Sequence, residues 1–170
     1  GIGIATFMLH AVKVGHIGAV DSNPYAIRSI QGDVERIGAA LKIDPILSEK
    51  VIPDGSEGPW VQKYIKNDCT DIIVSSPSWL PKDYDDGDDV GVFRSQRHED
   101  YFNELLSLSY PILRFDHGRL VILFSDYSTK KGLEVEHPIK VALRNKSKLF
   151  SLRSRQHKVI DEESNISAEL

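Results

Sequence analysis

Short apolar runs alternate along this chain with segments in which apolar residues recur every three or four positions. The helical spacing predicts helices at 4–14, 24–41, 60–66 and 98–113. The apolar runs predict strands at 17–20, 51–52, 70–75 and 120–124, with a closing pair at 139–143 and 149–152. Strands that alternate with helices favour a parallel sheet, because a parallel connection needs a crossover that usually contains a helix. We therefore expect an α/β fold with a doubly wound, mostly parallel sheet and helices on both faces.

The size and composition of the chain limit its class. Its 170 residues suit one domain with a sizeable core, which we expect over residues 1–160, followed by a polar tail over 161–170. No apolar run approaches the roughly 20 residues that cross a bilayer, and no signal peptide opens the chain. The single cysteine, Cys69, excludes an internal disulfide and a cysteine-based zinc cluster. These features predict a cytoplasmic protein with no membrane partner and no metal site.

Polar residues stand where three of the expected strands end. They are Asp21, Asp54 and Ser76, and the carboxyl ends of parallel strands form the ligand crevice of an open α/β sheet. Gly1 and Gly3 lead directly into the first expected helix, which suits a loop that brings a ligand close to N–H groups at a helix N-terminus. Asp21 lies about 20 residues after these glycines. In nucleotide-binding folds, a carboxylate at that spacing binds the ribose hydroxyls. The simpler interpretation of Asp21 is a charge that interacts with the dipole of the next helix.

The turn Ser76-Pro77-Ser78-Trp79 ends the strand at 70–75. A rigid turn of this composition can aim backbone carbonyls, offer a hydroxyl for hydrogen bonding and stack an aromatic ring on a planar group. The alternative is that Pro77 only stops the strand and that Trp79 fills a gap in the core. This segment alone favours neither interpretation.

Three segments of the chain together resemble one enzyme family. They are residues 1–6 (Gly-Ile-Gly-Ile-Ala-Thr), 18–27 (Gly-Ala-Val-Asp-Ser-Asn-Pro-Tyr-Ala-Ile) and 71–81 (Asp-Ile-Ile-Val-Ser-Ser-Pro-Ser-Trp-Leu-Pro). In these segments the chain is similar to class I S-adenosylmethionine-dependent methyltransferases, within the branch that carries an Asn/Asp-Pro-Pro-Tyr turn. That branch includes N-methyltransferases of RNA and DNA bases and the glutamine methyltransferases of peptide release factors. The resemblance runs from residue 1 to about 126 and implies a Rossmann-like sheet.

The resemblance also implies a role for each matching residue. S-adenosyl-L-methionine would be the cofactor, with Gly1 and Gly3 at its methionine end, Asp21 at the ribose, Ser22 and Asn23 along the adenine and Asp54 near the adenine amino group. Ser76, Pro77, Ser78 and Trp79 would match the Asn/Asp-Pro-Pro-Tyr turn, which in the family aligns a substrate nitrogen with the methyl group. The implied activity is N-methylation of an RNA base or of a protein glutamine amide, so the implied partner is RNA or protein.

The chain departs from the family pattern in two places. The strand that precedes the glycine loop in the family is absent from these residues, so we expect an N-terminally incomplete domain with its first strand missing. Ser76 and Ser78 replace Asn/Asp and the second proline, and a hydroxyl lacks the reach of a carboxamide, although Trp79 keeps a stacking face. One alternative is therefore a methyltransferase-like binding subunit without catalytic activity. A nucleotide-binding oxidoreductase would share the glycines and the acidic strand end, but it fits the proline turn poorly.

Two charged segments give opposing indications about nucleic acid. The expected loop at 80–97 carries a cluster of aspartates that would repel phosphates: Asp83, Asp85, Asp86, Asp88 and Asp89. Basic residues gather instead between 130 and 158, where they could form a nucleic-acid patch or a solvated face. The choice between RNA and protein as the acceptor therefore stays open.

Overall fold

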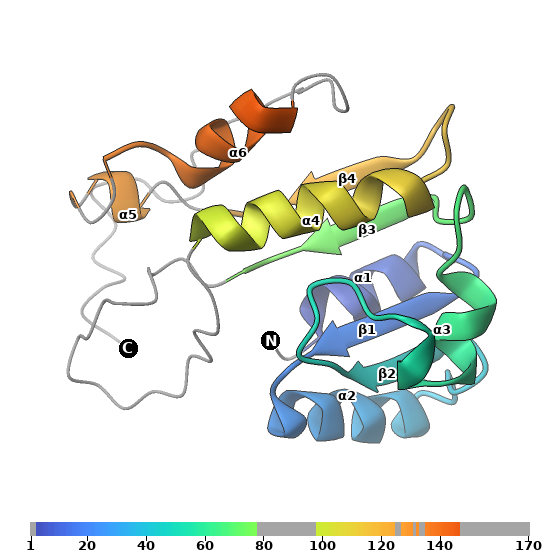
Figure 1. Ribbon diagram of the computed structural model, residues 1–170. Coiled ribbons are helices and arrows are strands. Elements are labelled where there is room, and N and C mark those ends of the chain that lie inside the picture. The colour runs from blue at the N-terminus through green and yellow to red at the C-terminus, as the bar shows by residue number, and fades with distance from the viewer. Residues whose placement is uncertain (1–2, 78–97, 125–126, 131, 133–134, 147–170) are drawn as a thin grey trace, which may run out of the picture.

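The computed structural model describes residues 3–77, 98–124, 127–130, 132 and 135–146, which form a mixed α/β structure (Figure 1). The elements follow one another in the order α1 (Ile4–Ala11), β1 (Ile17–Asp21), α2 (Pro24–Arg36), β2 (Ile43–Leu47), η1 (Gly55–Glu57), α3 (Pro59–Tyr64), β3 (Ile72–Ser75), α4 (His98–Ile112), β4 (Arg119–Ile122), α5 (Tyr127–Lys130) and α6 (Pro138–Lys146). Helices alternate with strands over the first nine of these elements, as the sequence predicts.

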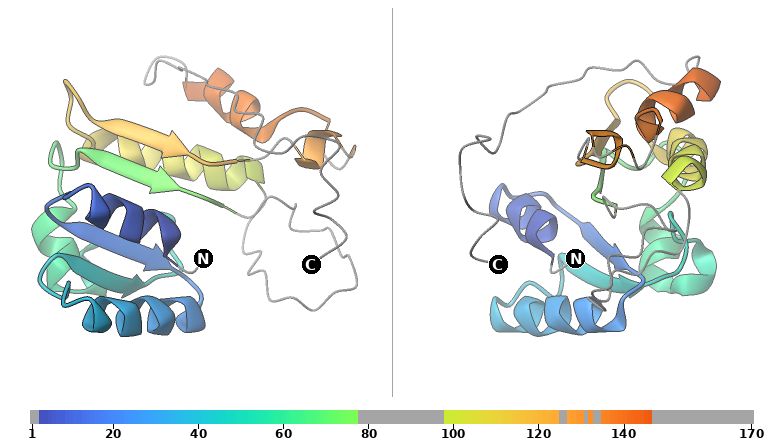
Figure 2. Two further views of the ribbon diagram at one scale, coloured as in Figure 1. Left: turned by 180° about the vertical axis from the view of Figure 1, so that it is seen from behind. Right: turned by 90° about the vertical axis from the view of Figure 1, so that its left-hand side faces the viewer.

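Two pairs of parallel strands organise the structure. β1 pairs with β2, with Ile17 opposite Ile43, and β3 pairs with β4, with Ile72 opposite Arg119. All four arrows point the same way in Figure 1 and again in the left-hand view of Figure 2, so the carboxyl ends of the strands lie toward one side of the molecule. The prediction of short parallel strands is confirmed. The described strands form two two-stranded sheets rather than the single sheet that we expected.

The first sheet is covered by α2, whose start is encoded locally. Asn23 caps the helix by accepting a hydrogen bond from the Tyr25 N–H at 2.8 Å, and Pro24 takes the first helical position, where no N–H donor is needed. The buried side of α2 includes Ile30 and Val34. These side chains join apolar residues of β1 and β2 in one core: Ile17, Ala19, Ile30, Val34, Ala39 and Ile43.

The second sheet has its own core around α4, which runs along β3 and β4 in Figures 1 and 2. Phe102, Leu105 and Leu106 are buried there together with Ala142 of α6. The strand expected at 139–143 is therefore wrong, because this segment lies within α6. Ile139 and Leu143 also pack on the core, and their spacing with Ala142 places all three side chains on one face of a helix.

The second strand of the first sheet differs most from the prediction. The helix expected to reach residue 41 ends at Arg36, and Gly38 follows in a left-handed conformation (φ 67°), as is common after a helix end. The strand expected at 51–52 lies instead at Ile43–Leu47, where Pro45 interrupts the apolar run. Proline is compatible with this position because β2 lies at the edge of its sheet.

Several predictions fall on residues outside the described ranges. They are the loop at 80–97, the strand at 149–152 and the polar tail at 161–170. Among the helices that are described, none combines the length and the apolar character that crossing a bilayer requires.

Candidate functional site

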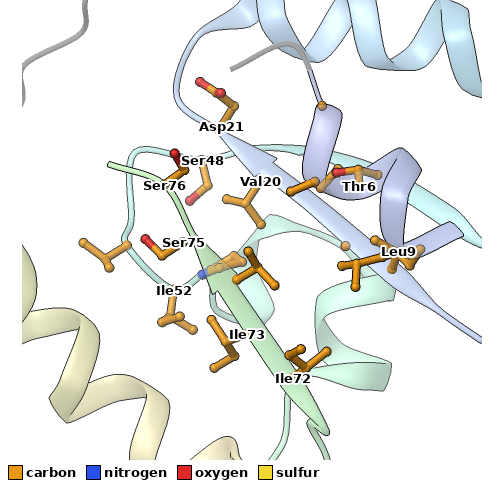
Figure 3. Close-up of a pocket in the computed structure, with 18 of the residues that line it drawn as sticks. Thr6, Leu9, Val20, Asp21, Ser48, Ile52, Ile72, Ile73, Ser75 and Ser76 are labelled. Carbon is orange, nitrogen blue, oxygen red and sulfur yellow. The ribbon is translucent and has the colours of Figure 1, made fainter. Parts of the chain in front are cut away.

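A cavity of about 1460 Å³ lies between the two sheets. Both β1 and β3 line it along their whole length, and α1 contributes residues to the same wall. Figure 3 shows the character of the two ends: Asp21, Ser48 and Ser76 stand toward one end, whereas Ile72 and Ile73 stand toward the other. The polar end coincides with the carboxyl ends of the strands, where the sequence predicts a ligand site.

Asp21 is held in place at the junction of β1 and α2. Its carboxylate accepts a hydrogen bond from the Asn23 N–H at 2.8 Å, while the Asn23 side chain caps α2. The backbone carbonyl of Asp21 accepts from the Ser48 N–H at 3.1 Å, which ties the ends of β1 and β2 together. Asp21, Ser22 and Asn23 all line the cavity. This arrangement presents a fixed, half-buried carboxylate beside a helix N-terminus.

Gly3 begins α1 at the same end of the cavity. Its φ of 81° lies in the left-handed region, and a Cβ atom there would come within 2.8 Å of the Ile30 side chain. Glycine is therefore required by both the backbone and the packing. No side chain caps the start of this helix, where the first N–H groups have no partner within the helix. These N–H groups belong to Ile4, Ala5 and Thr6, which line the cavity. A ligand that accepts hydrogen bonds suits this position.

Asp54 does not line the cavity, although Pro53 before it and its partner Lys50 do. Its carboxylate accepts hydrogen bonds from the Ser56 N–H at 2.9 Å and from Lys50, and these contacts, led by Lys50, hold the pKa of Asp54 well below its usual range. Glu57 completes a capping box by accepting from the Asp54 N–H at 2.7 Å. These contacts give the Asp54 carboxylate a local structural role in the turn around η1.

Ser48 holds the position that the sequence assigned to Asp54. It directly follows β2, is buried, lines the cavity and donates a hydrogen bond to Glu57. Ser48 could not be identified from the sequence, because Pro45 interrupts the apolar run of the strand that Ser48 follows. A strand assigned to 43–47 would have identified it.

A second missed feature is a pair of hydroxyl groups beneath the predicted turn. Ser75, the last residue of β3, is buried, and its hydroxyl lies 2.7 Å from that of Tyr101 on α4. Burial raises the pKa of Tyr101, so its hydroxyl stays protonated and able to donate. The pair joins α4 to the residue that immediately precedes Ser76. No local sequence pattern predicts this contact, because Tyr101 is distant from β3 in the sequence.

The structure brings together most of the predicted residues that it describes. Gly3, Asp21, Ser22, Asn23, Ser76 and Pro77 line one cavity, and Ser76 is exposed at its edge. Gly1, Ser78 and Trp79 fall outside the described residues. Within the described ranges, no three His, Cys, Asp or Glu side chains are grouped to hold a metal ion.

A comparison of the chain with protein-family models, curated proteins and solved structures finds no match. The functional interpretation therefore rests on the geometry of the cavity and on the sequence motifs.

The pairing of Tyr101 with Ser75 predicts a stability change. Tyr101→Phe leaves a buried serine hydroxyl without its partner, so we expect the free energy of unfolding to fall by about 1–3 kcal/mol. In a Ser75→Ala background the same change should cost much less, because neither hydroxyl then needs a partner. Urea unfolding of the four proteins measures both, with Tyr25→Phe as an exposed control. Equal losses from Tyr101→Phe in the two backgrounds would contradict the pairing.

The contacts of Asp54 predict a pH-dependent difference. Because its pKa is lowered in the folded state, its stabilising contribution is present above the unfolded pKa of about 3.9 and is lost as the pH falls below that value. Asp54→Asn should therefore be less stable than the original chain near pH 6, and the difference should shrink toward pH 3. Thermal unfolding across this range measures the effect. In a Lys50→Ala background the difference should be smaller at every pH, and an unchanged difference would show that Lys50 is not the main cause.

Proposed function

We propose that this chain is the S-adenosyl-L-methionine-binding part of a methyltransferase that acts on a planar nitrogen. The observation that carries the proposal is the convergence of three features on one cavity: Asp21 at the end of β1, the uncapped N-terminus of α1 after Gly3, and Ser76-Pro77 after β3. These features come from segments that are far apart in the sequence. They are also the segments in which the chain resembles class I methyltransferases.

The residues at the polar end fit much of such a cofactor. The Asp21 carboxylate suits the two hydroxyls of a ribose, and the first N–H groups of α1 suit a carboxylate. Gly3 allows the backbone to start α1 at this place, since any side chain there would collide with Ile30. Asp54 does not line the cavity and pairs with Lys50, so its neighbours after β2 are better placed than Asp54 itself for the role near the adenine. We assign that region to Ser48 and Glu49, which line the cavity after β2.

The task of the protein residues in this proposal is orientation. When bound, S-adenosyl-L-methionine supplies an activated methyl group on a sulfonium, so the chain has only to hold an acceptor nitrogen in line with it. The Ser76 hydroxyl can accept one hydrogen bond from an amino or amide group, and the Pro77 carbonyl, part of the same turn, can accept another. Ser75 and Tyr101 fix the backbone just before this turn. The acceptor class that we propose is an RNA base or a protein glutamine amide.

We also propose that the two sheets belong to one Rossmann-like, doubly wound sheet within a domain spanning residues 1–160. The common direction of the four strands and the shared cavity support this proposal.

The second candidate function is a methyltransferase-like binding subunit without catalysis. The observation that favours it is Ser76 itself. A serine hydroxyl forms fewer hydrogen bonds and has a shorter reach than the Asn or Asp side chain of the family. The two candidates share the cofactor cavity and differ in methyl transfer, so separate measurements of binding and of transfer distinguish them.

Cofactor binding is tested at Asp21. Asp21→Ala should weaken the binding of S-adenosyl-L-methionine and of its demethylated product by about 10- to 100-fold, because a hydrogen bond to a charged group contributes about 1.5–3 kcal/mol. Isothermal titration calorimetry measures the affinities. Asp33→Ala is the matched control, since Asp33 lies on α2, pairs with Arg36 and does not line the cavity. Equal affinity of Asp21→Ala and the original chain would overturn the cofactor assignment.

Methyl transfer is tested at the turn after β3. With a methyl-labelled cofactor and pools of RNA and of protein, Ser76→Ala should lower transfer by about 100-fold while cofactor affinity stays the same, because a small misplacement of the acceptor has an effect of that size. Trp79→Ala should also abolish labelling. Ser107→Ala, an exposed position on α4, serves as the control. If the original chain binds the cofactor but labels neither pool, the binding-subunit alternative is correct.

A further inference from the structure

The loops that lead into the four strands lie at the same side of the molecule, at the right in Figure 1. They span residues 12–16, 37–42, 65–71 and 113–118. The surface that they form also includes three residues beside them, Lys63, Tyr64 and Arg119, and we call it the amino-end surface. Asp21 and Ser76 follow the opposite ends of their strands, so this surface is separate from the polar end of the cavity.

Direct contacts join the first three of these segments into one patch. The rings of His16 and Tyr64 are stacked, with their centroids 4.5 Å apart and an angle of 28° between their planes. The ammonium group of Lys63 lies 4.8 Å from the centroid of the Tyr64 ring. Lys42 is held beside this pair, because its carbonyl accepts a hydrogen bond at 2.8 Å from the N–H of Ile17, the residue after His16. Aromatic and cationic side chains are therefore neighbours here.

Phe115 adds an exposed aromatic ring on a firmly held loop. It is 93% exposed, and its N–H donates a hydrogen bond at 2.7 Å to the carboxylate of Asp68, in the loop that follows α3. The residues around it are fixed by Asp71, whose carboxylate pairs with Arg114 at 2.8 Å and with His117 at 3.0 Å. A side chain on a backbone that is already ordered loses little freedom when a partner covers it. Phe115 therefore has the properties of a binding residue, and no core position explains it.

The amino-end surface also has an excess of positive charge. Its lysines and arginines are Lys13, Lys42, Lys63, Lys66, Arg114 and Arg119. Its carboxylates are Asp68, Asp71 and Asp116, and each of them already accepts a hydrogen bond or forms an ion pair within the surface. None of the four lysines forms an ion pair with a described residue. Beyond β1 and β2 the balance is reversed, and the charged residues there are Asp21, Glu49, Lys50, Asp54 and Glu57.

We propose that the amino-end surface binds a single strand of nucleic acid, whose bases stack on Phe115 and on the pair of His16 and Tyr64 and whose phosphates contact the lysines. Exposed aromatic rings among cationic side chains are the combination by which proteins hold single strands without reading their sequence. Cations alone would suit a duplex equally well, because phosphates dominate that affinity. The rings therefore select the single strand.

The surroundings of Phe115 favour nucleic acid over a membrane as the partner. Its neighbours along the chain are Arg114 and Asp116, both of which form ion pairs. Insertion of the ring into lipid would carry these charges toward an apolar phase, which is costly. Stacking on a base uses only a face of the ring and leaves the charged neighbours in water.

Fluorescence anisotropy with a labelled oligouridine of about 12 nucleotides tests this surface without any cofactor, so this inference and the proposed methyl transfer can fail independently. We expect the logarithm of the affinity to fall linearly with the logarithm of the salt concentration. Phe115→Ala should weaken binding by about 5- to 150-fold and leave the salt slope unchanged, because it removes stacking but no charge. Lys63→Ala and Lys66→Ala should each reduce the slope by about 0.7, the value for one phosphate contact to a single strand.

Matched controls come from the start of α2, where the exposed residues Tyr25 and Arg28 form a similar aromatic and cationic pair. Tyr25→Ala and Arg28→Ala make the same chemical changes at the opposite ends of the strands and should bind the oligouridine as the original chain does. The same strand paired with its complement should bind more weakly, because its bases are already stacked.

Three results would overturn the proposal. The first is no binding at about 50 mM salt, where phosphate contacts are strong. The second is equal affinity of Phe115→Ala and Tyr25→Ala, or a duplex that binds at least as tightly as the single strand, since either shows that stacking is absent. The third is binding to phosphatidylserine vesicles that depends on Phe115 while the oligouridine does not bind, which would identify a membrane surface instead.

Discussion

The hydrogen-bonding capacity of the parallel strands is the constraint on which the rest of this structure depends. A strand offers backbone donors and acceptors on both edges, and parallel neighbours must share one direction. β1 and β3 run in the same direction, and among the described strands each has one hydrogen-bonded neighbour. The shared direction gathers Asp21, Ser48 and Ser76 at one end of the molecule. The cavity onto which these residues open is lined by β1 of one pair and β3 of the other.

Local signals account for what the sequence predicted correctly. Asn23 and Pro24 mark the start of α2 through capping and a fixed backbone angle, and the helix begins at Pro24. The strand at β3 is an uninterrupted apolar run, which is also a local property. Two of the errors arose where packing outweighs the local pattern. Pro45 is acceptable within β2 because that strand lies at an edge, and 139–143 is helical because α4 offers an apolar partner.

The same distinction applies to the candidate site. Gly3 and Asp21 could be identified from the sequence because each lies at a fixed offset from an element that the sequence itself indicates. The prediction for Asp54 depended on a strand at 51–52, and in the structure Asp54 does not line the cavity and its carboxylate accepts hydrogen bonds from Lys50 and Ser56. The contact between Ser75 and Tyr101 joins residues 26 apart in the sequence. Such contacts depend on how α4 packs on β3, which periodicity does not specify.

The cavity has two chemically different parts, and the proposed function uses one of them. The polar groups, Asp21, the N-terminus of α1 and Ser76, stand at the carboxyl end of the strands, whereas the walls along β1 and β3 are apolar (Figure 3). Residues of both strand pairs, Asp21 from the first and Ser76 from the second, meet at the polar end. A ligand at the strand ends would therefore be held from both pairs at once, which is the rigidity that orientation of a substrate requires.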